Sequence, residues 1–384
     1  MTAPTRLDPI CDKALAGGVL SPAEGLELFR ALDLPSLGLL ADAVRHRLNP
    51  TSDGAPKVTY IIDRNVNPTN VCITDCGFCA FYRRPGDPEA YELTREVIYA
   101  KIEETIAAGG SQLLLQGGHH PYLKTTDFAA LFSDIKKHYP QIWLHGMSPP
   151  EIHHLSLLDK RSVRDVIAEL KEAGLDSVPG GGAEILVDRV RQIIAPKKAN
   201  TEQWLDVMRQ VSALGMRGTA TMMFGHVETD ADRVEHLTRI RELQDECGVF
   251  TAFIPWTFQP ENTEMAEVLP HKRTVAEYLR TLAFARIYLQ NVQHVQSSFV
   301  TQGMKTCQVG LAMGADDFGS VMLEENVVSS AGCSHPTSVA EIERHIKDAG
   351  YTPQRRTMLY EHIETPETDR FGKLPRKKSV VSSS

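Results

Sequence analysis

From Val58 onward, apolar and polar positions form a repeating unit. Each unit contains a short apolar run, a polar loop, an amphipathic segment that ends at glycine, and then the next apolar run. Apolar runs of four to eight residues between turn-forming residues are typical of buried strands. The pattern predicts eight strands, at 58–63, 112–116, 142–146, 176–178, 218–223, 250–255, 295–299 and 318–322.

The segments between these strands predict helices. Ser162 is expected to cap a helix whose apolar stripe (163, 166, 167 and 170) is followed by Gly174. Thr94, Thr201 and Asp230 are expected to begin similar helices. Strands that alternate with helices through short connections form a parallel sheet. About eight such units predict an α/β protein with a (β/α)8 TIM-like barrel, and an open doubly wound sheet is the alternative.

Three regions are predicted along the chain. Residues 1–57 form an N-terminal helical extension and linker, with a helical pattern interrupted at Pro35 and a Pro- and Gly-containing linker before Val58. Residues 58–362 form the barrel. Residues 363–384 are polar and end in a Ser-rich stretch, which predicts a disordered C-terminal tail.

Composition narrows the class of protein. The 384 residues include 41 basic and 49 acidic side chains, which gives a formal charge of −8. A mildly acidic chain is a poor candidate for binding nucleic acid. No apolar run approaches the roughly 20 residues that a membrane span needs, and the N-terminus lacks the apolar core of a secretion signal. We therefore expect a cytoplasmic protein with neither a nucleic-acid nor a membrane partner; its oligomeric state stays open.

Three of the seven cysteines lie close together. Cys72, Cys76 and Cys79 are separated by three and two residues, directly after the first predicted strand. Three thiolates at this spacing suit an iron–sulfur cluster and leave one iron open to a small molecule. A structural zinc site needs a fourth nearby ligand, and the next candidate downstream is His119, forty residues on. A redox-sensing or zinc-binding module remains the weaker interpretation.

This cysteine motif, with Phe78 just before its last cysteine, resembles the signature of the radical S-adenosylmethionine (SAM) superfamily. The resemblance implies a 4Fe–4S cluster bound by Cys72, Cys76 and Cys79, with SAM chelating the open iron through its amino and carboxylate groups. One electron from the cluster then cleaves SAM to methionine and a 5′-deoxyadenosyl radical.

Other strand-end motifs resemble the SAM-binding segments of that superfamily. Gln116-Gly117-Gly118 is similar to the segment that accepts hydrogen bonds from the SAM amino group, although a tight turn explains it equally well. Glu184 follows three glycines and is expected to bind the ribose or the sulfonium end of SAM. The predicted cofactor contacts are Phe78, Gln116, Gly117, Gly118, Ser148, Glu184, Met223, Gly225 and Glu228. Glu184 is also a predicted catalytic residue.

The segment from Thr221 to Glu228 resembles the one that packs against adenine. Thr221 departs from the family pattern, which usually has glycine there, and Glu228 has a second interpretation as an acidic residue at a helix N-terminus.

The resemblance is most specific to the cyclic dehypoxanthine futalosine synthases of the futalosine route to menaquinone. It covers about residues 20–362 and includes 63–70, 148–151, 179–185, 219–229 and above all 253–260. The implied reaction begins when the deoxyadenosyl radical removes the C4′ hydrogen of the ribose of dehypoxanthine futalosine. The carbon radical adds to the benzoate ring of the same molecule, and loss of an electron and a proton gives a spiro-cyclic product.

The resemblance also implies an electron donor such as flavodoxin or ferredoxin. Aminofutalosine synthase and the deazaflavin synthase subunits are the nearest alternatives in the superfamily. Outside it, a metal-dependent barrel hydrolase could use the histidines, but it leaves the three cysteines unexplained.

The proton lost at the end of the reaction needs a base. His119, His120, His145 and His226 lie at predicted strand ends. We expect His145 to act as this base, because it follows the apolar run 142–144 and should point into the barrel mouth.

Overall fold

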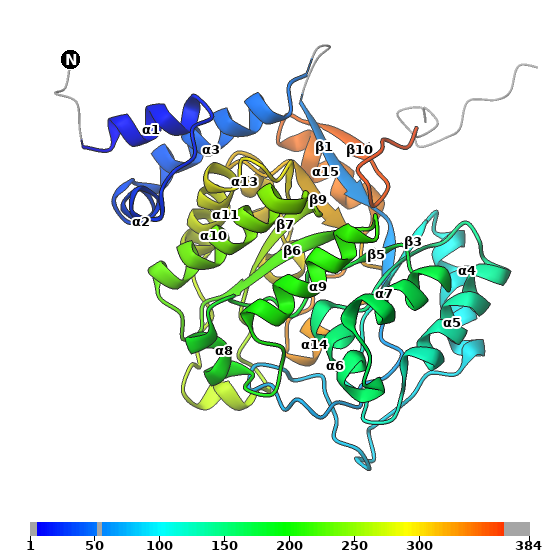
Figure 1. Ribbon diagram of the computed structural model, residues 1–384. Coiled ribbons are helices and arrows are strands. Elements are labelled where there is room, and N and C mark those ends of the chain that lie inside the picture. The colour runs from blue at the N-terminus through cyan, green and yellow to red at the C-terminus, as the bar shows by residue number, and fades with distance from the viewer. Residues whose placement is uncertain (1–5, 52–55, 365–384) are drawn as a thin grey trace, which may run out of the picture.

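The computed structural model describes residues 6–51 and 56–364 (Figure 1). Three helices precede the barrel: α1 (Asp8–Leu15), α2 (Pro22–Ala31) and α3 (Leu34–Leu48). Pro35 lies in the first turn of α3, where a proline costs no hydrogen bond, and Asp33 caps this helix by accepting from the Ser36 N–H at 3.0 Å. The helical pattern is therefore interrupted between Ala31 and Leu34, and Pro35 lies just after this break, in the first turn of the next helix.

The strands form two parallel sheets. The larger follows chain order: β2 (Asp63–Val66), β3 (Gln112–Leu115), β4 (Trp143–Gly146), β5 (Ser177–Val178), β6 (Arg217–Phe224), β7 (Phe250–Thr257) and β8 (His294–Val295). The smaller has the order β10 (Thr352–Arg355), β1 (Lys57–Ile61) and β9 (Asp317–Ser320).

These two sheets meet at two places. Only Ile62 separates β1 from β2, and a parallel bridge between Gln296 and Asp317 joins the end of β8 to β9. The sheet therefore curls into a barrel-like wall, and the predicted TIM-like α/β class is confirmed. The open sheet does not describe this molecule.

Helices cover the outside of the sheet (Figure 1). In chain order the longer ones are α4 (Arg95–Ala107), α5 (Thr125–His138), α6 (Pro149–Asp159), α7 (Val163–Glu172), α8 (Asp188–Ile194), α9 (Thr201–Ala213), α10 (Asp230–Cys247), α11 (Val275–Tyr288), α13 (Met304–Leu311) and α15 (Val339–Asp348). Short turns add η1 (Glu264–Glu267), α12 (Phe299–Gln302) and α14 (Val327–Ser330).

Most helix starts agree with the sequence pattern to within one residue. Ser162 caps α7 by accepting from the Asp165 N–H at 3.1 Å. The caps of α9 and α10 are Asn200 and Thr229, one residue before the predicted starts. Such differences of one residue are usual at helix ends.

Three strand predictions needed correction. The first strand divides into β1 and β2, which pair with different neighbours. The seventh predicted strand, 295–299, is β8 and ends at Val295, and Phe299 already belongs to α12. The edge strand β10 was missed, because its sequence Thr-Pro-Gln-Arg contains no apolar run.

The N-terminal helices pack on the outer layer of the barrel, α2 against α10 and α3 against α11. The proposed division at residue 57 stays a prediction. Most of the predicted disordered tail, 365–384, lies outside the described residues. Within the described ranges, no helix combines the length and the apolar character needed to cross a membrane.

Candidate active site

The inside of the barrel contains a cavity of about 270 Å³. Because side chains alternate across a strand, each long strand sends every second residue into it. The strand residues that line it include Ile61, Asp63, Asn65, Gln112, Leu114, His145, Thr219, Thr221, Ala252, Ile254 and Trp256. Residues from the strand ends and from the segment around α14 complete the wall.

The cysteine loop lies beyond β2 and is held in place by backbone hydrogen bonds. The Cys72 N–H donates to the Arg83 carbonyl at 2.9 Å, and the Gly77 N–H donates to the Ile194 carbonyl at 3.0 Å. Thr74 Oγ1 lies 2.9 Å from Cys72 Sγ and 3.6 Å from Cys76 Sγ, so these two sulfurs face the same hydroxyl.

The donor set of this loop fits an iron–sulfur cluster. Cys72 and Cys76 are buried and Cys79 is half-buried, and none of the seven cysteines forms a disulfide. Burial raises the pKa of Cys76 to about 11 and also raises that of Cys79. Within the described ranges, no three His, Cys, Asp or Glu side chains converge on a single ion. A cluster does not require that arrangement, because each thiolate binds a different iron.

Gly118 brings the cysteine loop against the end of β3. A Cβ at this position would lie 2.1 Å from the Val71 carbonyl oxygen and 2.9 Å from Cys72 Cβ, so only glycine fits. The Gln116 carbonyl accepts from Asn67 Nδ2 at 2.7 Å, and the Gly118 carbonyl accepts from the His120 N–H at 2.9 Å. The Gly117 carbonyl has no such partner among the described residues and is free to accept.

Glu184 is buried and paired with a lysine that sequence reasoning missed. Its Oε1 lies 2.8 Å from Lys198 Nζ, whose side chain is only 14% exposed. Burial raises the pKa of Glu184, but the Lys198 cation outweighs burial and holds it below its ordinary value. Lys198 Nζ also lies 5.3 Å from the ring centroid of Phe78. A buried ion pair therefore connects the glycine-rich turn after β5 with the cysteine loop.

Ser148 and Glu151 are hydrogen-bonded to each other at the start of α6. Glu151 Oε2 accepts from the Ser148 N–H at 2.8 Å and from Ser148 Oγ at 2.5 Å, while its Oε1 accepts from the Gly117 N–H at 2.9 Å. Burial raises the pKa of Glu151. Since its hydroxyl already donates to Glu151, Ser148 stabilises the Gly117 turn, and its contact with SAM stays a prediction.

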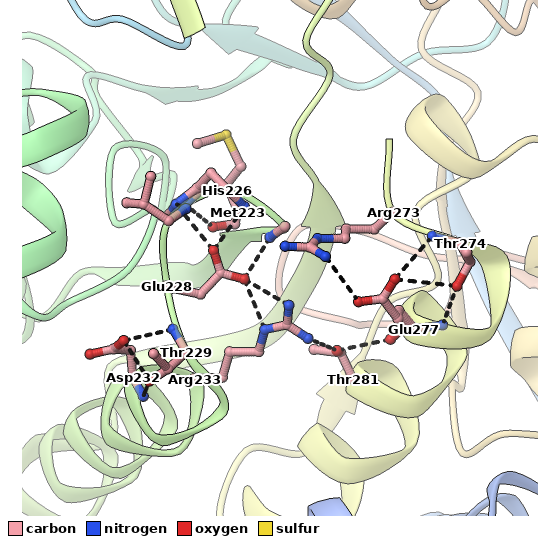
Figure 2. Close-up of polar contacts among 12 residues, drawn as sticks. Met223, His226, Glu228, Thr229, Asp232, Arg233, Arg273, Thr274, Glu277 and Thr281 are labelled. Carbon is pink, nitrogen blue, oxygen red and sulfur yellow. Dashed lines mark hydrogen bonds and ion pairs between the residues drawn. The ribbon is translucent and has the colours of Figure 1, made fainter. Parts of the chain in front are cut away.

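Figure 2 shows the turn after β6, where Glu228 organises the backbone. Its Oε1 accepts from the Gly225 N–H at 2.7 Å and from Arg233 Nη2 at 2.7 Å, and its Oε2 accepts from the His226 N–H at 2.8 Å. Gly225 has φ +98°, and a Cβ there would lie 2.3 Å from Arg273 Cγ. Both oxygens of Glu228 are thus used within the protein, and a direct contact of Glu228 with SAM stays a prediction.

Met223, at the end of β6, is almost completely buried. Its N–H donates to the Glu184 carbonyl at 3.0 Å. The two predicted cofactor segments, after β5 and after β6, are therefore joined directly.

His145 alone among the four candidate histidines lines the cavity. Its Nδ1 lies 2.7 Å from Ser177 Oγ, which also accepts from Trp143 Nε1 at 2.7 Å. Burial lowers the pKa of His145 to about 3, so the imidazole is neutral at pH 7 and able to accept a proton, although it is a weak base.

The other three histidines stabilise loops. His119 stacks on His154 with ring centroids 5.0 Å apart. His120 Nδ1 accepts from the N–H groups of residues 122 and 123, and His226 Nε2 donates to the Met223 carbonyl at 3.0 Å.

The structure adds residues that no motif revealed. Lys198 lies in the run Ala-Pro-Lys-Lys-Ala, which resembles an exposed loop in sequence. Arg356 and Tyr360, from the segment after β10, line the cavity although they lie far from every motif. Only the fold brings these residues to the site.

Two family models match the chain. Residues 66–240 match the model of the radical SAM superfamily, and residues 247–369 match that of the CofH/MqnC C-terminal region. The structure of methylornithine synthase (PylB) is similar in fold, with a TM-score of 0.69 and 16% identity over 90% of this chain and 97% of that one.

Curated relatives align along nearly the whole chain. The cyclic dehypoxanthine futalosine synthase of Streptomyces coelicolor is 45% identical over 94% of this chain and 90% of its own length. That of Halalkalibacterium halodurans is 43% identical over 94% and 96%. The aminodeoxyfutalosine synthase of Thermus thermophilus is 38% identical over 93% and 96%. The chain therefore belongs to the radical SAM superfamily and, within it, to the CofH/MqnC family.

Proposed function

We propose that this chain is a radical SAM cyclase that converts dehypoxanthine futalosine to cyclic dehypoxanthine futalosine. One observation carries the proposal: β3, whose side chains line the cavity, leads directly into the turn that supports the cysteine loop. Gln116 lines the cavity, and two residues later Gly118 contacts the loop at Cys72. A cluster bound by these cysteines would therefore lie beside the cavity, and the similarity to two cyclic dehypoxanthine futalosine synthases supports this substrate.

The protein's own residues bind and orient the reactants. A 4Fe–4S cluster with SAM supplies, when bound, a 5′-deoxyadenosyl radical that abstracts hydrogen. Cys72, Cys76 and Cys79 would hold the cluster, and the free Gly117 carbonyl would accept a hydrogen bond from the SAM amino group. We expect Glu184, kept ionised by Lys198, to accept from the ribose hydroxyls of SAM.

The cavity supports cyclisation in two ways. Most of the surface of its walls is apolar, which keeps water from a reactive carbon radical, and the walls hold the ribose and the benzoate ring close together. His145 is the candidate to take the rearomatising proton, since its neutral imidazole faces the cavity.

The electron donor and the location belong to the same proposal. A low-potential protein such as flavodoxin or ferredoxin is expected to reduce the cluster. Seven unpaired cysteines agree with a reducing, cytoplasmic setting.

The test is anaerobic incubation of reconstituted protein with SAM, dithionite and dehypoxanthine futalosine, followed by mass spectrometry. We expect 5′-deoxyadenosine together with a product lighter by two hydrogens. Changing Cys72, Cys76 and Cys79 together to alanine should abolish both products, whereas Cys247→Ala, which lies on the outer helix α10, should retain both. Wild-type protein that makes deoxyadenosine but leaves the substrate unchanged would rule out this substrate.

A further inference from the structure

Gln116 presents a free side-chain amide at the end of the cavity next to the cysteine loop. It follows β3 directly and lines the cavity. Both polar atoms of its amide keep accessible surface, and neither has a hydrogen-bond partner among the described residues. Gly118, two residues further along, packs against Val71 and Cys72 of the cysteine loop. A ligand group that binds the Gln116 amide would therefore lie close to that loop.

Gly181 leaves the space that this amide occupies. A Cβ on Gly181 would lie 2.4 Å from Gln116 Nε2. The glycine turn is held in place, because the Gly180 N–H donates to Thr219 Oγ1 at 2.9 Å and the Gly181 carbonyl accepts from Trp204 Nε1 at 3.3 Å. The amide thus lies against this turn without a hydrogen bond to it, and its polar atoms are left for a ligand.

Asn65 adds a free donor beside Gln116. Asn67 Nδ2 donates to Asn65 Oδ1 at 3.3 Å and to the Gln116 carbonyl at 2.7 Å, so it holds these two residues close together. Because the amide oxygen of Asn65 is used, the atom left to bind a ligand is its Nδ2. This nitrogen has no partner among the described residues, and Asn65 lines the cavity. This end of the cavity therefore offers two amide donors and one amide acceptor.

Two hydroxyl groups on adjacent carbons match these atoms. A glutamine amide has a donor and an acceptor side by side, so one hydroxyl can accept from its nitrogen while the next donates to its oxygen. An ionised carboxylate has no hydrogen to donate and would leave the amide oxygen unmatched. Among the described residues that line the cavity, Arg356 alone carries a permanent positive charge, and it already binds Asp317 through two of its nitrogens. This end of the cavity therefore suits a sugar better than a benzoate carboxylate.

We infer that the Gln116 amide binds two neighbouring ribose hydroxyls of the substrate and holds this sugar beside the cysteine loop. The inference rests on the proposed function, because it takes dehypoxanthine futalosine as the ligand. It places the sugar whose C4′ hydrogen is removed next to the loop where the radical would form. On this assignment the Gln116 side chain binds the substrate, while the free Gly117 carbonyl beside it is left for SAM.

Two variants test the assignment in different ways. Gln116→Leu removes the amide at similar volume and breaks no hydrogen bond among the described residues, so the fold should be retained. Gly181→Ala keeps Gln116, but its Cβ should displace the amide, because the atom it meets is the end of a flexible side chain. Each should raise the Kd for the substrate, measured by calorimetry without SAM, about tenfold, as expected for the loss of one or two hydrogen bonds. Each should leave the Kd for SAM unchanged.

A labelled substrate tests positioning separately from affinity. With deuterium at C4′, wild type should transfer the label into 5′-deoxyadenosine. At saturating substrate, Gln116→Leu should form more unlabelled deoxyadenosine per product, because the sugar is no longer held beside the radical. A purely structural role would not change this ratio. Gln210→Leu is the matched control, since Gln210 lies on the outer helix α9 and its amide donates to Asp206 on the same helix.

A double-mutant cycle with the ligand identifies the contact. A substrate analogue that lacks a hydroxyl bound by Gln116 should lose less affinity through Gln116→Leu than the complete substrate does. Equal weakening of every single-hydroxyl analogue would overturn the assignment, and so would a variant that weakens SAM instead of the substrate. Wild type that neither binds nor converts dehypoxanthine futalosine would refute the proposed function itself. Wild type that converts it, with both variants unchanged in Kd and in label transfer, would refute only the role of Gln116.

Discussion

Replacing Lys198 with methionine should destabilise the protein far more than replacing its neighbour Lys197. The Lys198–Glu184 pair is 2.8 Å long, and its side chains are 14% and 4% exposed. Removing one partner of a buried pair leaves an uncompensated charge and costs roughly 3–5 kcal/mol. Lys197 binds Asp75 at 2.6 Å but is 59% exposed, and surface pairs contribute only about 0–1 kcal/mol.

The difference in stability between wild type and the Lys198→Met variant should grow as the pH rises. In wild type the pKa of Glu184 lies below its ordinary value, so the pair stabilises the fold at neutral pH and loses this effect as the pH falls through the folded pKa. Without Lys198, burial dominates and raises the pKa of Glu184. The variant should therefore lose stability as the pH rises above about 4.3, the ordinary pKa of glutamate, and the gap to wild type should be wider at pH 8 than at pH 5.

The assay is urea unfolding of anaerobically reconstituted protein, followed by the fluorescence of its three tryptophans. Lys197→Met is the matched control. The double variant Glu184→Gln with Lys198→Met should recover much of the lost stability, because the buried charge is gone. The reasoning is refuted if the two lysine variants unfold at the same urea concentration, or if the double variant is no more stable than Lys198→Met.

Three further outcomes are expected. Gly118→Ala should lose iron, because its Cβ would meet the Val71 carbonyl oxygen at 2.1 Å, whereas Gly86→Ala, with no atom within 4 Å of the added carbon, should retain it; colorimetric iron analysis separates them. His145→Gln should stop product formation while deoxyadenosine still forms, and because the wild-type pKa is about 3, the activity profile of wild type between pH 5 and 9 should show no His145 titration. Glu228→Gln should weaken SAM binding, measured by equilibrium dialysis, because it loosens the turn at Gly225.

The barrel could be predicted because each of its strands and helices is specified by residues close together in the sequence. Each buried strand needs an apolar run, and each helix needs a stripe and a cap, so the pattern identified eight strands. The cysteine motif is local too, since three ligands within one loop are visible in the sequence. The edge strand β10 could not be predicted from the sequence, because its residues are half-buried or exposed and its pairing partner β1 lies almost 300 residues earlier.

The polar part of the site could not be predicted, because its contacts, like the pairing of β10, join residues that are far apart in the sequence. Whether Glu228 contacts SAM or the backbone depends on where Arg233 and the Gly225 turn lie. The same sequence motif is compatible with both contacts. Lys198 gives no pattern of its own, and its importance arises only because the turn after β5 brings Glu184 within 2.8 Å. Burial of a charged side chain is a property of the fold, and no window of sequence contains it.

Strand β3 connects the two ends of the site. It runs from Gln112, which lines the cavity, to Leu115, and Gln116 and the glycines that support the cysteine loop follow directly. At about 3.3 Å per residue, Gln112 and Leu115 at the two ends of β3 lie about 10 Å apart. Because β3 pairs along its length with β2 and β4, that separation is rigid. Radical transfer needs its atoms held to within a fraction of an ångström, and a paired strand provides this where a loop could not. The paired strand therefore fixes how far the Gln112 end of the cavity lies from the turn that supports the cysteine loop.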